Sequence, residues 1–359
     1  MTTIRVTLHG VTVEVGAEET AFVDYVRTAF GAFLAEPGTP VDVRSHLRWR
    51  DEPPTADLVR SFGPEARWTR RPDRDLYVGD GTAYWLRIDD FPDLHLAARI
   101  DGECLHLEGL YHFYLGRGAA EPLRRWRHRA RMDQLRARRF STLLYYLVYH
   151  PILWRLSRQR GWCVVHGGAV AAPAGAIALS GMPGCGKSTL AVTALRDPAR
   201  TMLSDNLILH DGRHVYACPE LLLLDDRSRS LAGAAVERLH ATGERRVFGR
   251  DAHAPDRVCT DPCTPQAWFH VGRSATSACD SVDPDRCADR VLEGNWMAKE
   301  VRRIAIMGTV LDAVAGTRAP DERAPLSALL DATPCYELWC GEERGPADVL
   351  TDLVEPLLV

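Results

Sequence analysis

Apolar residues recur at every second position through most of the first 110 residues. Residues 1–16 alternate on both sides of His9-Gly10, which predicts a β-hairpin. Helical spacing replaces the alternation at residues 22–34 and ends before Glu36-Pro37-Gly38, so one long helix is predicted there. Further strands are predicted at residues 41–49, 76–88 and 94–107, the last folding back at Asp101-Gly102, with a polar loop at residues 50–75.

The rest of the chain changes pattern twice. Residues 111–160 are helical, with an arginine run at 124–139 followed by apolar residues at helical spacing. Beyond them the pattern predicts strands at 163–170, 176–179, 200–205 and 336–340, a hairpin at Asp211-Gly212, helices over 189–195 and 347–357, and a mobile polar segment at 236–265. We therefore expect a β-rich N-terminal domain (1–110), a helical connector (111–160) and an α/β domain (161–359).

Composition excludes several classes of protein. Of the 359 residues 46% are hydrophobic and 26% charged, which is an ordinary globular mixture. The formal net charge of −4 gives no basic bias, so we expect no nucleic-acid partner. The N-terminus has no signal-peptide pattern and no apolar run reaches the length of a bilayer span, so we expect a cytoplasmic protein without a membrane partner.

The ten cysteines are scattered through the chain. A chain of this size without a secretion signal needs no disulfide framework, so we expect free thiols. The densest group is Cys259, Cys263, Cys279 and Cys287, but only the first two have a spacing that suits structural zinc. Reduced cysteines are therefore favoured, and a metal at Cys259 and Cys263 is left open.

A complete phosphate-binding loop pattern occupies residues 181–188. It follows a predicted strand and precedes a predicted helix, which is the setting that the pattern requires. Glycines let successive backbone N–H groups turn towards an anion, and the helix N-terminus adds its positive end. The predicted nucleotide-binding residues are Gly181, Met182, Pro183, Gly184, Cys185, Gly186, Lys187, Ser188 and Thr189. Lys187 would reach the β- and γ-phosphates of ATP, and Ser188 would ligate Mg²⁺.

Phosphoryl transfer also needs a carboxylate near the metal and the acceptor hydroxyl. Asp205 ends a predicted strand, where such sheets present ligands, and is the expected base and metal ligand. Asn206 is able to ligate Mg²⁺ but cannot act as a base. His166 precedes Gly167-Gly168 on the strand before the loop strand, and would orient Asp205 or shuttle a proton. A strand-end cap at Asp205 and a structural histidine at 166 are the alternatives.

Two groups of arginines are further candidates for functional roles. Arg245, Arg246 and Arg250 would close over the transferring phosphoryl group as a lid, or remain solvated loop charges. The arginine run at 124–139 would be a solvated helix face, or a docking surface for an acidic peptide or protein.

Several segments together resemble the HPr serine kinase family. They are His166-Gly-Gly-Ala-Val, the loop ending in Gly-Cys-Gly-Lys-Ser-Thr, Leu203-Ser-Asp-Asn, and Ala217-Cys-Pro-Glu220. The chain looks most similar to the HPr-kinase-related branch found beside peptide natural-product pathways, and the resemblance covers about residues 140–225. It implies an α/β fold shared with phosphoenolpyruvate carboxykinase, in which a strongly bent mixed sheet surrounds the phosphate loop, plus a smaller N-terminal α+β domain. It also implies that Lys187 and Ser188 hold phosphates and Mg²⁺.

The chain departs from that family at two points. The family shows two adjacent aspartates, and the second is Asn206 here, so Asp205 would have to serve as the base alone. The glycine-rich signature of true HPr kinases is not recognisable after Glu220, which argues against reverse phosphorolysis and against HPr as the substrate.

The sequence therefore predicts an ATP- and Mg²⁺-dependent kinase acting on a Ser or Thr hydroxyl of a ribosomally made peptide or small protein. One alternative is a kinase of a small molecule such as free serine or a sugar. The other is a nucleotide-gated binding or regulatory protein without catalysis, which Asn206 favours. A homo-oligomer is left open, since no segment specifies an interface.

Overall fold

The computed structural model describes residues 2–54, 69–70, 76–79, 81–88, 91–116, 118, 120–247 and 250–358, with backbone alone at 69–70, 238, 240–247 and 250–252. These residues form a mixed α/β protein with several sheets, as the sequence predicted at the level of fold class. Their contacts divide the chain into two compact units. Unit 1 comprises residues 1–158 and 306–319, and unit 2 comprises residues 159–305 and 320–359. The helical segment predicted as a connector thus belongs to unit 1 almost entirely.

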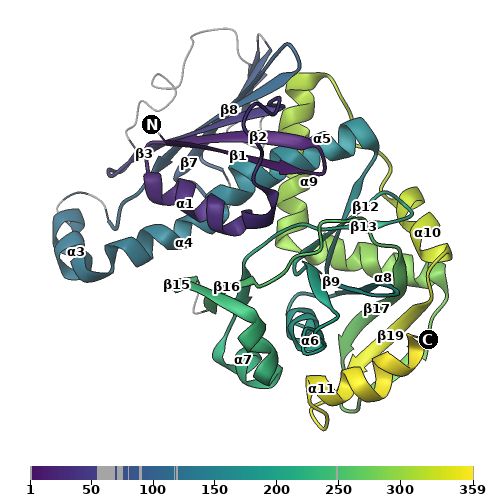
Figure 1. Ribbon diagram of the computed structural model, residues 1–359. Coiled ribbons are helices and arrows are strands. Elements are labelled where there is room, and N and C mark those ends of the chain that lie inside the picture. Colours follow the sequence, from purple (N-terminus) through teal and green to yellow (C-terminus); the bar gives the residue numbers. More distant parts are fainter. Residues whose placement is uncertain are drawn as a thin grey trace. The chain divides into compact units, whose positions relative to one another are not determined.

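Unit 1 is built on one mixed sheet in the strand order β1-β2-β3-β8-β7-β6-β5-β4 (Figure 1). Its strands are β1 (Thr2–Leu8), β2 (Val11–Ala17), β3 (Val43–Arg50), β4 (Thr69–Arg70), β5 (Leu76–Gly79), β6 (Thr82–Trp85), β7 (Leu94–Asp101) and β8 (Cys104–His112). The first hairpin turns at His9-Gly10, where both residues have positive φ, as predicted. Strand β3 pairs in parallel with β2 on one side and with β8 on the other, so it joins the first hairpin to the rest of the sheet.

Unit 1 contains five α-helices or parts of α-helices within the described residues, some of which pack on one face of this sheet. They are α1 (Thr20–Ala29), α3 (Ala120–His128), α4 (Met132–Leu144), α5 (His150–Arg160) and the end of α9 (Lys299–Ala315), and the π-helical segment η3 (Tyr145–Tyr149) joins α4 to α5. Both α1 and η3 pack against β2. Alternate residues such as Val13, Val15 and Leu47 are buried beneath these helices, which leaves polar residues such as Glu14 and Arg44 on the other face.

Unit 2 contains a larger mixed sheet in the order β13-β12-β9-β10-β17-β19-β18, with β11 pairing separately with β9, and a small sheet in the order β14-β16-β15. Its strands are β9 (Cys163–Ala172), β10 (Gly175–Gly181), β11 (Thr201–Ser204), β12 (Leu207–His210), β13 (Val215–Tyr216), β14 (Leu222–Leu224), β15 (Leu239–Val247), β16 (Arg250–Pro255), β17 (Pro265–Arg273), β18 (Ala278–Ser281) and β19 (Cys335–Cys340). The parallel pairs β10–β17 and β17–β19 lie at its centre, and antiparallel strands flank them.

The helices of unit 2 are α6 (Lys187–Ala194), α7 (Asp226–Ala232), α8 (Pro284–Met297), α10 (Arg323–Asp331) and α11 (Pro346–Val349), together with the first part of α9. An apolar cluster joins α6 and the C-terminal helical segment to the sheet through residues such as Leu179, Leu190 and Val349. Helix α8 packs against β9, β10 and β17. It begins at Asp283, whose carboxylate accepts hydrogen bonds from two backbone N–H groups, and Pro284 occupies the first turn.

Two predictions about local structure were wrong. Residues 76–88, expected as one strand, contain the β5–β6 hairpin, because Gly81 turns the chain with a φ of 70°. Residues 236–265, expected as a mobile segment, contain β15 and β16, which pair with one another and with β14. Strand pairing satisfies the backbone of this polar segment although it offers few apolar residues. Among the residues that the structure describes, no helix is long and apolar enough to cross a membrane.

Candidate functional site

The glycine-rich loop at residues 181–188 connects β10 to α6, so the predicted strand and helix do flank it. Gly181, Gly184 and Gly186 have φ values of 138°, 82° and 110°. A Cβ at Gly181 would lie 2.3 Å from the carbonyl oxygen of Val271 on β17, so only glycine fits there. Gly186 caps α6 in a left-handed conformation, and the first backbone N–H groups of that helix therefore open onto the loop.

Lys187 is folded back onto this loop. Its ammonium donates hydrogen bonds to the carbonyl oxygens of Gly181 (2.8 Å) and Met182 (3.0 Å), and its side chain is almost fully buried. Burial lowers the pKa of Lys187, and the nearby Cys185 and the carboxylate of Asp205 oppose that shift. The same loop leaves Ser188 and Thr189 half-buried in the first turn of α6.

Asp205 and Asn206 occupy the short gap between β11 and β12, which both pair with β9. The backbone N–H of Gly167 donates to the carbonyl oxygen of Asn206 at 3.1 Å. A Cβ at Gly168 would lie 3.1 Å from the carbonyl oxygen of Asp205, so this glycine lets the segment approach β9 closely. A Cβ at Gly167 would instead lie 2.5 Å from the carbonyl oxygen of Leu179 on β10. Both Asp205 and Asn206 remain half-exposed.

His166 lies on β9 in register with Leu207, one residue before those glycines. Burial and, to a lesser extent, the positive charge of Lys187 lower the pKa of His166 to about 4, against the opposing effect of a hydrogen bond with the backbone of Asn206. The imidazole is therefore neutral at pH 7. A neutral imidazole of such low basicity is suited to orienting a neighbour rather than to storing a proton.

The structure thus brings Lys187, Asp205 and His166 to one end of the unit 2 sheet. The strand pairing places them there: Ser180, at the end of β10, pairs with Gly167 next to His166, and the N–H of Gly167 bonds to the carbonyl of Asn206 next to Asp205. The electrostatic effects agree, since Asp205 raises the pKa of Lys187 and Lys187 lowers that of His166. Such influence requires proximity, because charge interactions weaken with distance.

Two side chains that the sequence did not single out hold this end of the sheet. Asn295 of α8 accepts a hydrogen bond from the backbone N–H of His166 (2.7 Å) and donates one to the carbonyl of Val164 (3.1 Å). His270 on β17 lies 3.3 Å through Nδ1 from the hydroxyl of Ser180. Burial and the charges of Arg290 and Lys187 together lower the pKa of His270 to about 4, against the opposing charge of Glu337. No local sequence pattern marks either residue.

Three arginines that the sequence did not single out line a cavity beside the start of α6. Arg227, Arg273 and Arg344 surround a volume of about 100 Å³ that is also bounded by Gly186 and Thr189. Arg273 reaches the loop itself, since a Cβ at Gly186 would lie 3.5 Å from its guanidinium. Guanidinium groups bind phosphates and stack on planar rings, so this cavity is suited to the part of a nucleotide next to its phosphates.

Arg245, Arg246 and Arg250 lie in the β15–β16 pair, where Arg246 faces Asp251 and Arg250 faces Val247 along the backbone register. Their side chains lie outside the described part of the structure, so the lid role stays a prediction. The arginine run at 124–139 lies in unit 1, on α3, α4 and the 3₁₀ turn between them. In this run Arg125 pairs with Glu121 (2.6 Å) and Arg136 with Asp51 (2.6 Å), which favours a partly neutralised helix face.

All ten cysteines are free thiols. The sulfur atoms of Cys259 and Cys263 lie 3.6 Å apart in the segment between β16 and β17. Within the described part of the chain, no group of three or more His, Cys, Asp or Glu side chains is placed to hold a metal ion.

Comparison with protein-family models and with curated proteins gave no match to this chain. The functional assignment therefore depends on the chemistry of the site itself.

Proposed function

We propose that the protein is an ATP- and Mg²⁺-dependent kinase that phosphorylates a Ser or Thr hydroxyl of a ribosomally synthesised peptide or small protein. The observation that carries the proposal is the convergence of Lys187, Asp205 and His166 at the end of the sheet where the glycine-rich loop begins. A mixed sheet around this loop agrees with the fold that the resemblance to HPr-kinase-related proteins implies.

The loop would hold the triphosphate. The N–H groups at the start of α6 offer donors to phosphate oxygens, and Lys187 would exchange the carbonyls of Gly181 and Met182 for the β- and γ-phosphates. Because the ammonium is buried, its attraction to a phosphate is weakly screened by water. Arg273 would add positive charge beside Gly186.

Ser188, Asp205 and Asn206 fit Mg²⁺ as a ligand set. They offer a hydroxyl, a carboxylate and an amide oxygen, which are the hard donors that Mg²⁺ prefers, and all three are half-exposed, which leaves room for the water molecules it retains. When bound, the ion would neutralise charge on the β- and γ-phosphates.

In the transfer step the acceptor hydroxyl oxygen forms a bond to the γ-phosphorus while the bond from that phosphorus to the bridging oxygen breaks, and ADP leaves. Asp205 accepts the hydroxyl proton, because its carboxylate acts on Lys187 more strongly than that of Glu300 does, and because it follows β11, which pairs with β9 beside the loop strand. Neutral His166 would fix the position of Asp205 or of the acceptor, consistent with its pKa of about 4.

The test is phosphoryl transfer from labelled ATP to candidate peptides by the Asp205→Asn protein. Transfer is expected to fall by about a thousandfold or more while ATP affinity, measured by calorimetry, stays within about threefold. Asp280→Asn, on the exposed strand β18, is the matched control and should keep full activity. Normal turnover in the Asp205→Asn protein would reject the proposed base.

A nucleotide-gated binding protein is the second candidate, and Asn206 favours it because the site has one carboxylate where the family that it resembles has two. This candidate predicts ATP binding without transfer to any acceptor. The Asn206→Asp protein separates the two: a catalytic site should keep or gain activity, whereas a binding protein should remain inactive.

A further inference from the structure

The polar face of the unit 1 sheet carries a groove that the proposed phosphoryl transfer does not use. The groove has a volume of about 360 Å³ and is lined by residues from β1 across to β6. These strands follow one another in five steps, β1-β2-β3-β8-β7-β6, so at about 4.8 Å a step the groove is about 24 Å long. It therefore runs across the strands and not along one of them.

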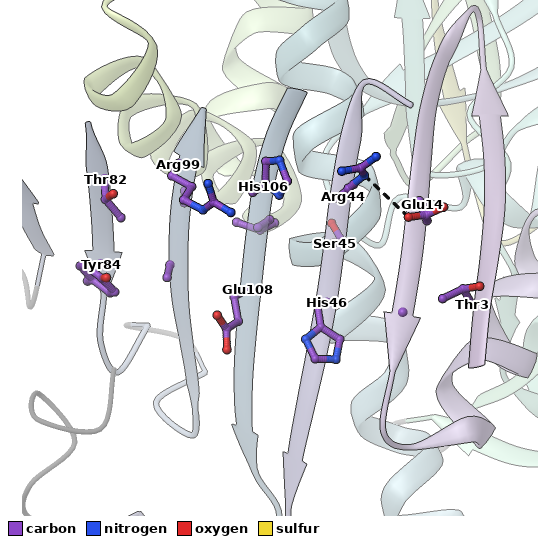
Figure 2. A pocket seen from close by; sticks show the side chains of 14 residues that line it. Thr3, Glu14, Arg44, Ser45, His46, Thr82, Tyr84, Arg99, His106 and Glu108 are labelled. Atoms are coloured by element: carbon purple, nitrogen blue, oxygen red, sulfur yellow. Dashed lines mark ion pairs between the residues drawn. The ribbon is translucent and has the colours of Figure 1, made fainter. Parts of the chain in front are cut away.

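Three basic side chains form a row along this groove. Arg44 on β3 is in register with His106 on β8, and His106 is in register with Arg99 on β7. Figure 2 shows the three side by side on adjoining strands. Arg44 and Arg99 thus place two positive charges on either side of His106, and both lower its pKa. A negatively charged ligand over this row would relieve their mutual repulsion.

Two acids near the arginines neutralise them only weakly. Glu14 on β2 is in register with Arg44 but is itself paired with Arg5 at 2.6 Å, and Asp101 lies two residues beyond Arg99 on β7. Glu14 lies 3.8 Å from Arg44, and Asp101 lies 3.9 Å from Arg99. The side chains of the two arginines are 57% and 55% exposed, and ion pairs this long and this exposed contribute little. The effect on His106 agrees with this: burial, Arg99 and Arg44 together lower its pKa against the opposing charge of Asp101.

The depth of the groove comes from a second row of residues, two positions away from the basic row on each strand. This row places Gly16, His46, Glu108 and Ala97 in register on β2, β3, β8 and β7. Gly16 has no side chain and Ala97 only a methyl group, so the floor of the groove is low at both places. Glu108 is held by Arg48 at 3.1 Å, which reduces the negative potential inside the groove.

We propose that this groove binds an extended acidic segment of a peptide, with its carboxylates against Arg44 and Arg99. An extended chain advances about 3.3 Å per residue, so about seven residues would fill the groove, whereas a single small anion would occupy one end of it. The assignment of this peptide as a substrate rests on the proposed kinase function, but its binding requires no nucleotide.

Binding is measured on the full-length protein without ATP, by fluorescence anisotropy with a labelled heptapeptide of alternating Glu and Ser. Arg99→Gln and Arg44→Gln should each weaken binding at least about tenfold, the loss expected for one charge-assisted hydrogen bond. Arg27→Gln, at an exposed position of α1 outside the groove, is the matched control and should bind as the wild type does. A peptide with Gln in place of Glu should bind at least about tenfold more weakly.

Several outcomes would overturn the proposal. These are no binding by the wild type, unchanged affinity in both groove variants, or an equal loss in Arg27→Gln. Complete displacement by millimolar inorganic phosphate would assign the groove to small anions, and equally tight binding of a thymidine heptanucleotide would assign it to polyanions in general. Unchanged thermal melting of the variants excludes misfolding. Peptide binding without any phosphoryl transfer would retain the groove and reject the kinase.

Discussion

Replacing Lys187 with Met should remove most of the stabilisation that ATP gives to unit 2. In the wild type, ATP at a hundred times its Kd stabilises the folded state by about 2.7 kcal/mol. For a unit of this size, one kcal/mol corresponds to about 2–4 °C in Tm, so a shift of about 5–10 °C is expected.

The variant should lose the contact of the buried ammonium with the phosphates. A hydrogen bond between charged groups is worth about 1.5–3 kcal/mol, so the loss of about 2.7 kcal/mol would raise the Kd about a hundredfold. The same ATP concentration then equals the Kd and stabilises the protein by only about 0.4 kcal/mol, which is about 1 °C in Tm. The side chain of Met is similar in length, so the packing near Cys185 is largely retained.

Differential scanning fluorimetry with and without ATP and Mg²⁺ measures both shifts. Lys299→Met, at an exposed position of α9, is the matched control and should keep the wild-type shift. A shift in the Lys187→Met protein that stays within about 2 °C of the wild type would refute the reasoning, because Lys187 would then make no phosphate contact.

Three further predictions follow from buried groups. The pKa values of His166 and His270 are about 4 in the folded protein, below the ordinary 6.5. As the pH falls, these imidazoles are therefore protonated in the unfolded chain before they are protonated in the folded protein. Urea denaturation should therefore show full stability above pH 6.5 and a loss of up to about 3 kcal/mol per imidazole as pH falls to 4, and a flat profile over that range would contradict it. Gly167→Ala would place a Cβ 2.5 Å from the carbonyl oxygen of Leu179 and should destabilise unit 2 by about 1–3 kcal/mol in the same assay. Asp312→Ala leaves Arg158 without the carboxylate that it contacts at 2.7 Å and should cost about 3–5 kcal/mol, read as faster hydrogen exchange in unit 1.

Local patterns predicted the elements that depend on neighbouring residues. Alternation and the Asp-Gly pairs identified the hairpins at Asp101-Gly102 and Asp211-Gly212, because turn chemistry acts over a few residues. The strand and helix around Lys187 were predicted for the same reason. The β5–β6 hairpin was missed although the sequence carries the same signal there, Asp80-Gly81, because the prediction treated residues 76–88 as one strand.

The positions of other residues depend on tertiary packing, which local sequence patterns do not predict. His270 lies beside Ser180 because β17 pairs in parallel with β10 although more than 80 residues separate them, and nothing in the sequence predicts that register. The position of Asp312 could not be predicted from the sequence for the same reason. This residue lies far along the chain but belongs to unit 1, where it accepts hydrogen bonds from Arg158 (2.8 Å) and Trp154 (2.9 Å).

The glycines of unit 2 explain why the site is found at this end of the sheet. Gly168 lets Asp205 approach β9, Gly167 lets β9 approach Leu179 on β10, and Gly181 lets β10 approach Val271 on β17. The backbone segments therefore meet where side chains would keep them apart. This close packing buries Lys187 and His166 together, and burial lowers the pKa of both. The imidazole of His166 is neutral, and the ammonium of Lys187 is held by two carbonyl groups. Within the described residues, no anionic group lies at hydrogen-bond distance from this ammonium, so its positive charge would be available to an incoming phosphate. Under the proposed function, this arrangement would favour a highly charged anion over a neutral ligand, and the carboxylate of Asp205 would be the group that accepts a proton.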